Sequence, residues 1–193
     1  MHTAIEHMEI VFAILTGIGL SAACGFRVFV PLLFLNLASI YGYVHLAPGF
    51  EWIGGNQATI ALTLASALEI TAYYFPLLDN ILDAISSPVS MIAGILATAS
   101  LITDMPSSLK WMISIVAGGG IAGILQGATV VLRVKSSLFT GTIGNAGIAT
   151  LELAGAAILS LLAIIIPLIA FIVAALFAVY WIFQIFYDKL KAP

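Results

Sequence analysis

Long apolar stretches, separated by short polar or glycine-rich breaks, dominate the pattern along the chain. A helix needs roughly 20 apolar residues to cross the hydrocarbon core of a bilayer, with about 17 as the lower limit. Stretches of about this length occupy residues 9–25, 28–44, 57–75, 88–103, 111–132, 146–166 and 168–187. The pattern therefore predicts an all-α fold, a polytopic transmembrane helical bundle of about seven spans that forms a single transmembrane domain over residues 1–193.

Two of the divisions between these spans are not marked by polar loops. The first apolar stretch is interrupted only at Gly25–Arg27, and the last one, residues 146–187, only by Pro167. A single helix over 146–187 would be about 60 Å long, roughly twice the thickness of the bilayer core. It must therefore turn back, kink strongly or leave the membrane. Six spans with one re-entrant piece is the alternative to seven.

The composition agrees with a membrane protein. The chain is 62% hydrophobic and 8% charged, with a mean hydropathy of +1.18, whereas a soluble domain carries about 25% charged residues. We therefore expect its exterior to face the lipid bilayer. The net charge of −3 and the lack of a basic run argue against a nucleic-acid partner. A single cysteine excludes an internal disulfide.

Basic residues orient the predicted spans, because cytoplasmic loops of membrane proteins are enriched in Lys and Arg. With seven spans, the basic residues that share one side are Arg27, Arg133, Lys135, Lys189 and Lys191. Lys110 is the one exception. This arrangement predicts an N-terminus outside and a C-terminus in the cytoplasm.

Glu69 lies well inside the third predicted span, where an ionisable side chain is costly and is by default a functional hypothesis. Its helical face continues through Tyr73, Pro76, Asn80, Asp83 and Ser87. The segment 75–88, which also contains Asp79, alternates Asp and Asn with Leu and Ile at helical period and lacks Lys, Arg and Gly. We interpret it as an amphipathic or re-entrant piece, with a short helix on the cytoplasmic surface as the alternative.

The sixth predicted span carries a second polar face. Asn145 and Glu152 lie two helical turns apart on one side, and Gly141, Gly144 and Gly147 make the preceding backbone pliable. Glycine-rich, broken segments at membrane depth are where transporters expose backbone groups to a substrate or ion. The alternative is that Glu152 is a buried structural carboxyl group.

Arg27 has three physically open roles: an anchor at the lipid headgroups, a counter-ion for a carboxylate, or a contact for an anionic substrate. Its guanidinium suits the last two, because it donates parallel hydrogen bonds and does not deprotonate. Gly25 and Pro31 favour a discontinuous helix around it. We predict the counter-ion role, with Arg27 at the cytoplasmic end of a polar pocket and paired with Asp83 or Asp79.

Two weak echoes hint at an internal inverted repeat. Residues 58–70 align with 141–153, so that Glu69 matches Glu152, and Arg27-Val28 resembles Arg133-Val134. The small residues at helical spacing are Gly17, Ser21 and Gly25 in the first span, and Gly119, Gly123 and Gly127 in the fifth. Small residues at this spacing allow close helix packing, either within the bundle or in a homo-oligomer. The triple glycine 118–120 is alternatively a local helix break that lines a cavity.

The polar residues inside the predicted membrane segments point to transport rather than to catalysis. We predict a small permease or channel for a small polar solute or ion, coupled to protons or cations through intramembrane carboxylates. A non-transporting scaffold or subunit of a larger membrane complex is the alternative. The predicted pathway residues are Arg27, Glu69, Asp79, Asn80, Asp83, Asn145 and Glu152. No catalytic or metal-binding motif is visible, so we expect no enzyme activity, no cofactor and no metal.

Several segments carry a family resemblance: GFRVFVPLL from Gly25, LEITAYYFPLLDNILDAISSP from Leu68, and the GN…ATLELAGA stretch from Gly144. With these segments the chain resembles a bacterial family of small polytopic membrane proteins known only as a domain of unknown function. The resemblance covers roughly residues 10–170 and implies a compact helical fold in the bacterial inner membrane. It implies no activity.

Overall fold

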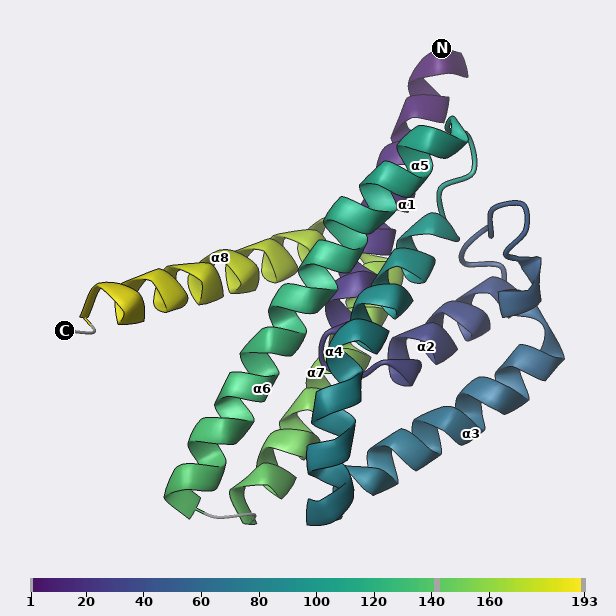
Figure 1. Ribbon diagram of the computed structural model, residues 1–193. Coiled ribbons are helices and arrows are strands. Elements are labelled where there is room, and N and C mark those ends of the chain that lie inside the picture. The colour runs from purple at the N-terminus through teal and green to yellow at the C-terminus, as the bar shows by residue number, and fades with distance from the viewer. Residues whose placement is uncertain (1, 141–142, 192–193) are drawn as a thin grey trace.

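The computed structural model describes residues 2–140 and 143–191; within these ranges, the side chains of residues 2–6, 76–80, 83, 139–140, 143, 186 and 188–191 lie outside the description. The described chain folds into helices (Figure 1). In chain order they are α1 (His2–Cys24), α2 (Phe29–Ile40), the 3₁₀ turn η1 (Glu51–Gly54), α3 (Asn56–Ala72), α4 (Pro76–Ala99), α5 (Ser107–Ile113), the π-helical η2 (Ser114–Gly119), α6 (Gly120–Thr140), α7 (Ile143–Ile165) and α8 (Pro167–Lys191). Because α5, η2 and α6 are continuous, the described residues form seven helical stretches, which confirms the predicted bundle of about seven helices.

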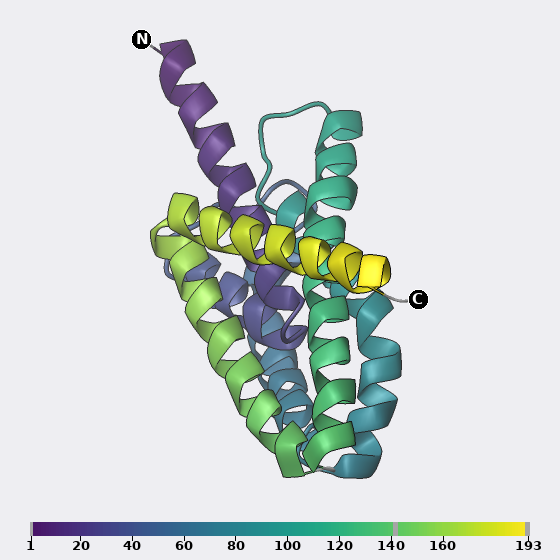
Figure 2. The same cartoon turned by 90° about the vertical axis from the view of Figure 1, so that its left-hand side faces the viewer.

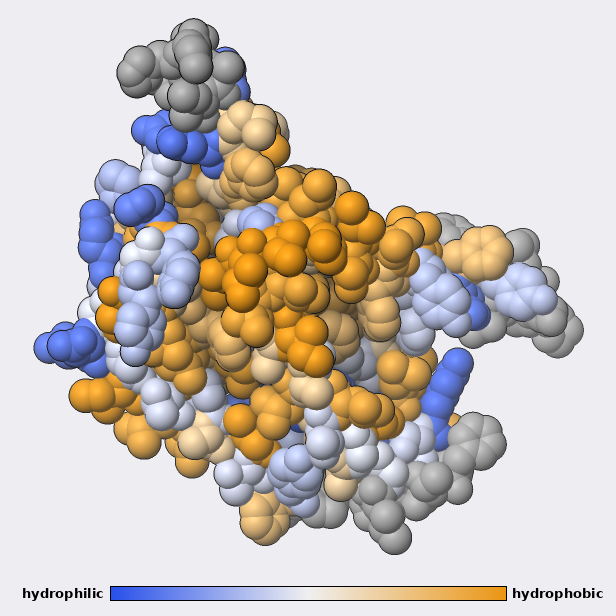
Figure 3. Space-filling view, turned by 180° about the vertical axis from the view of Figure 1, so that it is seen from behind, coloured by the Kyte–Doolittle hydropathy of each residue, from blue (hydrophilic) through white to orange (hydrophobic). Residues whose placement is uncertain are grey.

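Four segments among the described residues are long and apolar enough to cross a membrane: His7–Cys24, Ser107–Leu138, Gly144–Ile165 and Pro167–Ile185. Phe29–Ile40 and Ala84–Ala99 are shorter apolar helices. Apolar side chains also spread over much of the surface seen from behind (Figure 3). The chain is therefore a multi-pass membrane protein, as its composition predicts.

Helix α2 is shorter than the predicted span 28–44. Its 12 residues give a length of about 18 Å at 1.5 Å per residue, well below the roughly 30 Å core of a bilayer. The helix ends because Gly42 adopts a φ of 74°, a left-handed conformation that glycine tolerates. The Tyr43 N–H then donates to the Ala38 carbonyl oxygen at 2.8 Å, which closes the helix C-terminus. The predicted boundary was wrong because the apolar sequence continues past this turn.

Proline marks three helix starts. Pro31 is the third residue of α2, Pro76 begins α4 and Pro167 begins α8. Proline suits the first helical turn, where its missing N–H is not needed. At Pro167 the chain turns sharply, so that α8 crosses the bundle at a steep angle to α7 (Figure 2). This confirms the predicted break of the 146–187 stretch.

Two local predictions are corrected by the fold. The segment 75–88 is not a separate piece, because residues 76–99 form one helix, α4, that continues through Pro88. The triple glycine 118–120 does not break its helix either. Instead, η2 inserts a π-helical turn between α5 and α6, and such turns are frequent at functional sites.

Small residues hold α1, α4 and the η2–α6 region in close contact. A Cβ atom added to Gly118 would lie 2.5 Å from the Thr98 Oγ1 atom, and one added to Gly94 would lie 2.8 Å from the Ala122 Cβ atom. In α1, the Ser21 hydroxyl donates to the Gly94 carbonyl oxygen at 2.6 Å. Of the predicted small-residue faces, Gly25 packs closely against Leu125 and Gly119 against Ile95, whereas Gly127 has open space around it, so these faces serve helix packing within this chain only in part. A homo-oligomer through glycine-rich faces stays a prediction.

The two sequence echoes do not belong to one repeat. Helices α3 and α7, which carry Glu69 and Glu152, run in opposite directions, as an inverted pair would (Figure 1). Helix α1 precedes Arg27 and helix α6 carries Arg133, and these two helices run in the same direction. One inversion cannot relate both pairs.

Candidate functional site

Arg27 lies in the turn between α1 and α2, and this turn lies inside the bundle. Its residue is 1% exposed, with Cys24 and Val28 beside it at 0% and 4%. In Figure 1 the turn lies about halfway along α6. The alternative of a headgroup anchor is therefore wrong: both α1 and α2 have an end within the protein, next to a buried cation.

The Arg27 guanidinium uses only part of its hydrogen-bonding capacity. Its Nη2 donates to the Ala149 carbonyl oxygen at 2.8 Å and lies 3.4 Å from the Glu152 Oε2 atom. Its carbon Cζ lies 3.8 Å from the centre of the Tyr73 ring. Its Nε and Nη1 atoms have no acceptor among the described groups. Because Nε carries one N–H and Nη1 carries two, three of the five N–H donors are unused.

Arg133 of α6 and Glu152 of α7 form the neighbouring ion pair. The Arg133 Nε atom donates to Glu152 Oε1 at 2.9 Å, and its Nη2 donates to Oε2, so the pair is bidentate. Arg133 also lies 4.2 Å from the Tyr73 ring centre. Glu152 therefore serves two guanidinium groups, and both guanidinium groups contact one tyrosine. We call Arg27, Glu69, Tyr73, Arg133 and Glu152 the buried charged centre.

Glu69 caps a helix that it does not belong to. From α3, its Oε1 accepts the Val28 N–H at 2.7 Å and its Oε2 accepts the Phe29 N–H at 3.0 Å. These are amide groups at the start of α2, which no intrahelical carbonyl can satisfy. A carboxylate is favourable there, because the N-terminus of a helix carries partial positive charge. Glu69 thus fixes the α1–α2 turn that carries Arg27.

The Tyr73 hydroxyl links the buried charged centre to α4 and α6. It donates to the Ser86 Oγ atom at 3.3 Å, and the Gln126 Nε2 atom donates to the same oxygen at 3.0 Å. Ser86 in turn donates to the Leu82 carbonyl oxygen at 2.6 Å. Ser86 of α4, itself held by Gln126 of α6, therefore fixes the position of the tyrosine side chain.

The other predicted pathway residues are not all brought together. Asn145 hydrogen-bonds with the Ser137 hydroxyl at 3.0 Å and joins α7 to α6. The side chains of Asp79, Asn80 and Asp83 lie outside the described residues, and so does the predicted pairing of Arg27 with Asp83 or Asp79. Among the described carboxylates, Glu152 is the one within 4 Å of Arg27.

A groove, which we call the lateral groove, opens beside the buried charged centre, between α2 and α3 on one side and α4 on the other. Its volume is about 420 Å³, and its walls include Leu68, Leu82 and Ile85. Glu69 and Tyr73 also line it. Because Tyr73 also contacts the Arg27 guanidinium, one side chain separates the groove from that cation.

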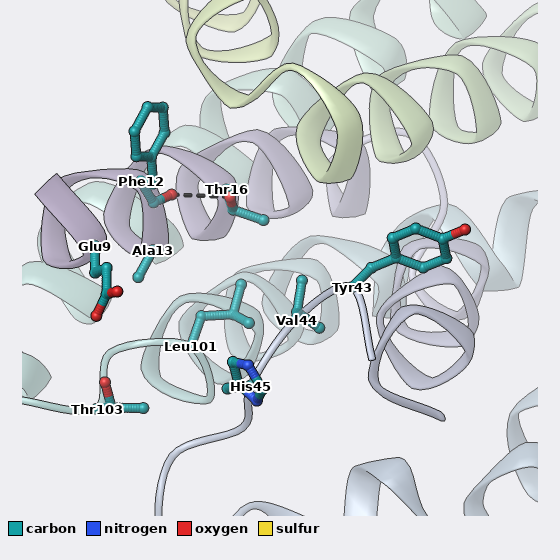
Figure 4. A pocket seen from close by; sticks show the side chains of 9 residues that line it. All are labelled: Glu9, Phe12, Ala13, Thr16, Tyr43, Val44, His45, Leu101 and Thr103. Carbon is teal, nitrogen blue, oxygen red and sulfur yellow. Dashed lines mark hydrogen bonds between the residues drawn. The ribbon is translucent and has the colours of Figure 1, made fainter. Parts of the chain in front are cut away.

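A second pocket lies near the start of α1 and is separate from the centre. Glu9 and Thr16 of α1 line it, together with His45 and Thr103 from two loops, around about 460 Å³ (Figure 4). Thr16 precedes Arg27 by 11 residues, or about 16 Å along a helix. The fully buried Leu20 lies on α1 between Thr16 and Arg27. No group of three or more metal-ligating side chains occurs in the described part of the chain.

Comparison with known protein families identifies the family to which this chain belongs. The family model described as "Domain of unknown function (DUF4126)" matches residues 14–186. The chain belongs to this family. No curated protein and no solved structure matches it. The DUF4126 match includes every residue of the buried charged centre, and it carries no statement of activity.

In this DUF4126 chain, sequence reasoning missed Arg133 as a member of the site. Arg133 was counted as a marker of a cytoplasmic loop, but it is 2% exposed. The available signal was its echo of Arg27, because in each case the pair Arg-Val follows a glycine-rich helix. Since both arginines are buried inside the bundle, neither marks a cytoplasmic loop, and the predicted orientation of the termini rests on the remaining basic residues and stays a prediction.

Proposed function

We propose that this chain is a small permease or channel of the bacterial inner membrane that moves a small polar solute or ion. The observation that carries the proposal is Arg27, a buried cation at a turn between two helices, with three N–H donors that have no acceptor among the described groups. Transporters commonly bind substrates where broken helices meet near the middle of the membrane. A lock that served only to hold helices together would be expected to use its donors fully, because unsatisfied buried donors are destabilising.

Glu69 is the carboxylate best placed to couple a proton to this movement. It lines the lateral groove, and it also holds the first amides of α2. Protonation would remove its charge and weaken both hydrogen bonds. The α1–α2 turn would then be freer to move, and Arg27 would move with it. Protonation of Glu69 would in this way change how accessible Arg27 is to the solute.

A scaffold role is the second candidate, and the Arg133–Glu152 pair supports it. That pair is bidentate and joins α6 to α7, as an interhelical lock would. The two candidates differ in one measurable property, because a scaffold moves no solute.

The test is solute-driven proton movement in liposomes that contain the purified protein and an internal pH dye. The panel consists of potassium acetate, nitrate, chloride and sulfate, together with glycine and glucose as neutral-charge solutes. We expect at least one solute to drive proton movement with wild type. Glu69→Gln should abolish it, whereas Asp104→Asn, at an exposed carboxylate, should behave as wild type. Equal signals from protein-containing and empty liposomes across the panel, with protein that remains monodisperse, would contradict the proposal and leave the scaffold.

A further inference from the structure

We infer that the solute is a small monovalent anion and that Arg27 is its direct contact. This inference rests on the proposed function and names the class of its substrate. The starting point is chemical: an arginine side chain has donors and no acceptor. Whatever binds the unused Nε and Nη1 atoms of Arg27 must therefore present an acceptor, and a cation is repelled there.

The surroundings of Arg27 favour a charged acceptor over a neutral one. A buried guanidinium needs a nearby negative charge. Its nearest described carboxylate, Glu152, lies 3.4 Å away but is engaged through both oxygens by Arg133. The other described carboxylate of the centre, Glu69, is hydrogen-bonded to the amides of Val28 and Phe29. Arg27 thus shares one counter-ion with a second cation, and an anion would complete its pairing.

The same carboxylates limit the charge and size of the anion. At the same position Glu69 and Glu152 repel a dianion twice as strongly as a monovalent anion, and the cost of taking an ion out of water rises with the square of its charge. The guanidinium is 1% exposed and in contact with the Tyr73 ring, so an anion of only a few atoms could be accommodated beside it. Acetate, nitrate and chloride are of this kind, and sulfate is not.

We place the route to Arg27 at the lateral groove, whose walls are mainly apolar but include Glu69 and Tyr73. Tyr73 both lines the groove and lies against the guanidinium, so its ring separates the two. An anion on this route passes Glu69, which also lines the groove. Passage is easier when Glu69 is protonated, so one anion is expected to cross with one proton.

Binding is tested by thermal unfolding of the detergent-solubilised full chain in potassium acetate, nitrate, chloride and sulfate at matched ionic strength. We expect a saturable rise in unfolding temperature with the monovalent anions and none with sulfate. Arg27→Lys keeps the positive charge but loses the planar guanidinium with its paired N–H donors, and it should weaken the apparent affinity for the monovalent anions at least tenfold. Lys110→Gln, which removes a cation elsewhere, should leave it unchanged. Arg27→Gln should abolish the effect; if it does not fold, Arg27→Lys carries the test.

Three outcomes separate this inference from the proposed function. No saturable anion effect would mean that water alone fills the unused donors, and the inference would fail. Proton-coupled movement of cations or neutral solutes, without anion binding, would contradict the inference and support the permease. Saturable anion binding that depends on Arg27, without movement across liposomes, would keep the anion site and overturn the permease.

Discussion

Replacing Glu152 with glutamine tests whether one carboxylate stabilises two buried guanidinium groups. The change keeps the size of the side chain but removes the negative charge that accepts from Arg133 and lies 3.4 Å from Arg27. Removing one partner of a buried ion pair typically costs about 3–5 kcal/mol, because the other charge is left uncompensated. Since two cations depend on Glu152, we expect the upper part of this range, about 4–5 kcal/mol.

The assay is thermal unfolding of the detergent-solubilised protein, followed by tryptophan fluorescence. For a chain of 150–250 residues, 1 kcal/mol corresponds to roughly 2–4 °C, so Glu152→Gln should lower the unfolding temperature by about 8–20 °C. The matched control is Glu51→Gln at an exposed carboxylate, which should stay within about 0.5 kcal/mol of wild type.

A double-mutant cycle adds the pairwise evidence. Arg27→Gln removes one of the two stranded cations, so the double variant Glu152→Gln with Arg27→Gln should be more stable than the sum of the single effects predicts. We expect a coupling of about 1–3 kcal/mol. Additivity within about 0.5 kcal/mol, or a single variant Glu152→Gln as stable as the Glu51→Gln control, would refute the argument that Glu152 compensates Arg27.

Three further changes test separate parts of the structure. Glu69→Ala should destabilise the protein by about 1–3 kcal/mol through loss of the α2 cap, and hydrogen exchange should accelerate at the Val28 and Phe29 amides; unchanged exchange there would contradict the cap. Gly118→Ala should cost about 1–3 kcal/mol by overpacking against Thr98, whereas Gly127→Ala, which has open space, should be nearly neutral by thermal unfolding; equal effects would disprove the packing account. Tyr73→Leu should cost about 1–4 kcal/mol through two lost cation–π contacts, and Tyr73→Phe, which keeps the ring, should cost clearly less in the same assay.

The membrane class and the helix count could be predicted because they depend on local composition and length. Pro167 marked the last break, and Glu69 and Glu152 stood out as carboxylates within apolar helices. The short length of α2 was missed although its signal is local: Gly42 is a glycine at a helix end, and the apolar residues around it concealed the turn.

The partners within the site could not be predicted, because they depend on how helices distant in sequence meet. Arg27 contacts Ala149 and Glu152, more than 120 residues away along the chain. Glu69 looked like a pathway carboxylate, but its two hydrogen bonds to α2 follow only from the position of α3. Arg133 was interpreted as a loop residue because a sequence does not reveal that α6 extends past it for another seven residues.

The most direct test of the central claim, that Arg27 is a contact for a solute and not only a helix lock, is the position of a bromide ion in crystals of the full chain. Bromide is a small monovalent anion that anomalous scattering locates. The account predicts an anomalous peak within hydrogen-bond distance of the Arg27 Nε or Nη1 atom, absent from crystals of Arg27→Lys or clearly weaker in them. Ordered water at both nitrogen atoms, with no bromide peak at saturating concentration, would contradict it.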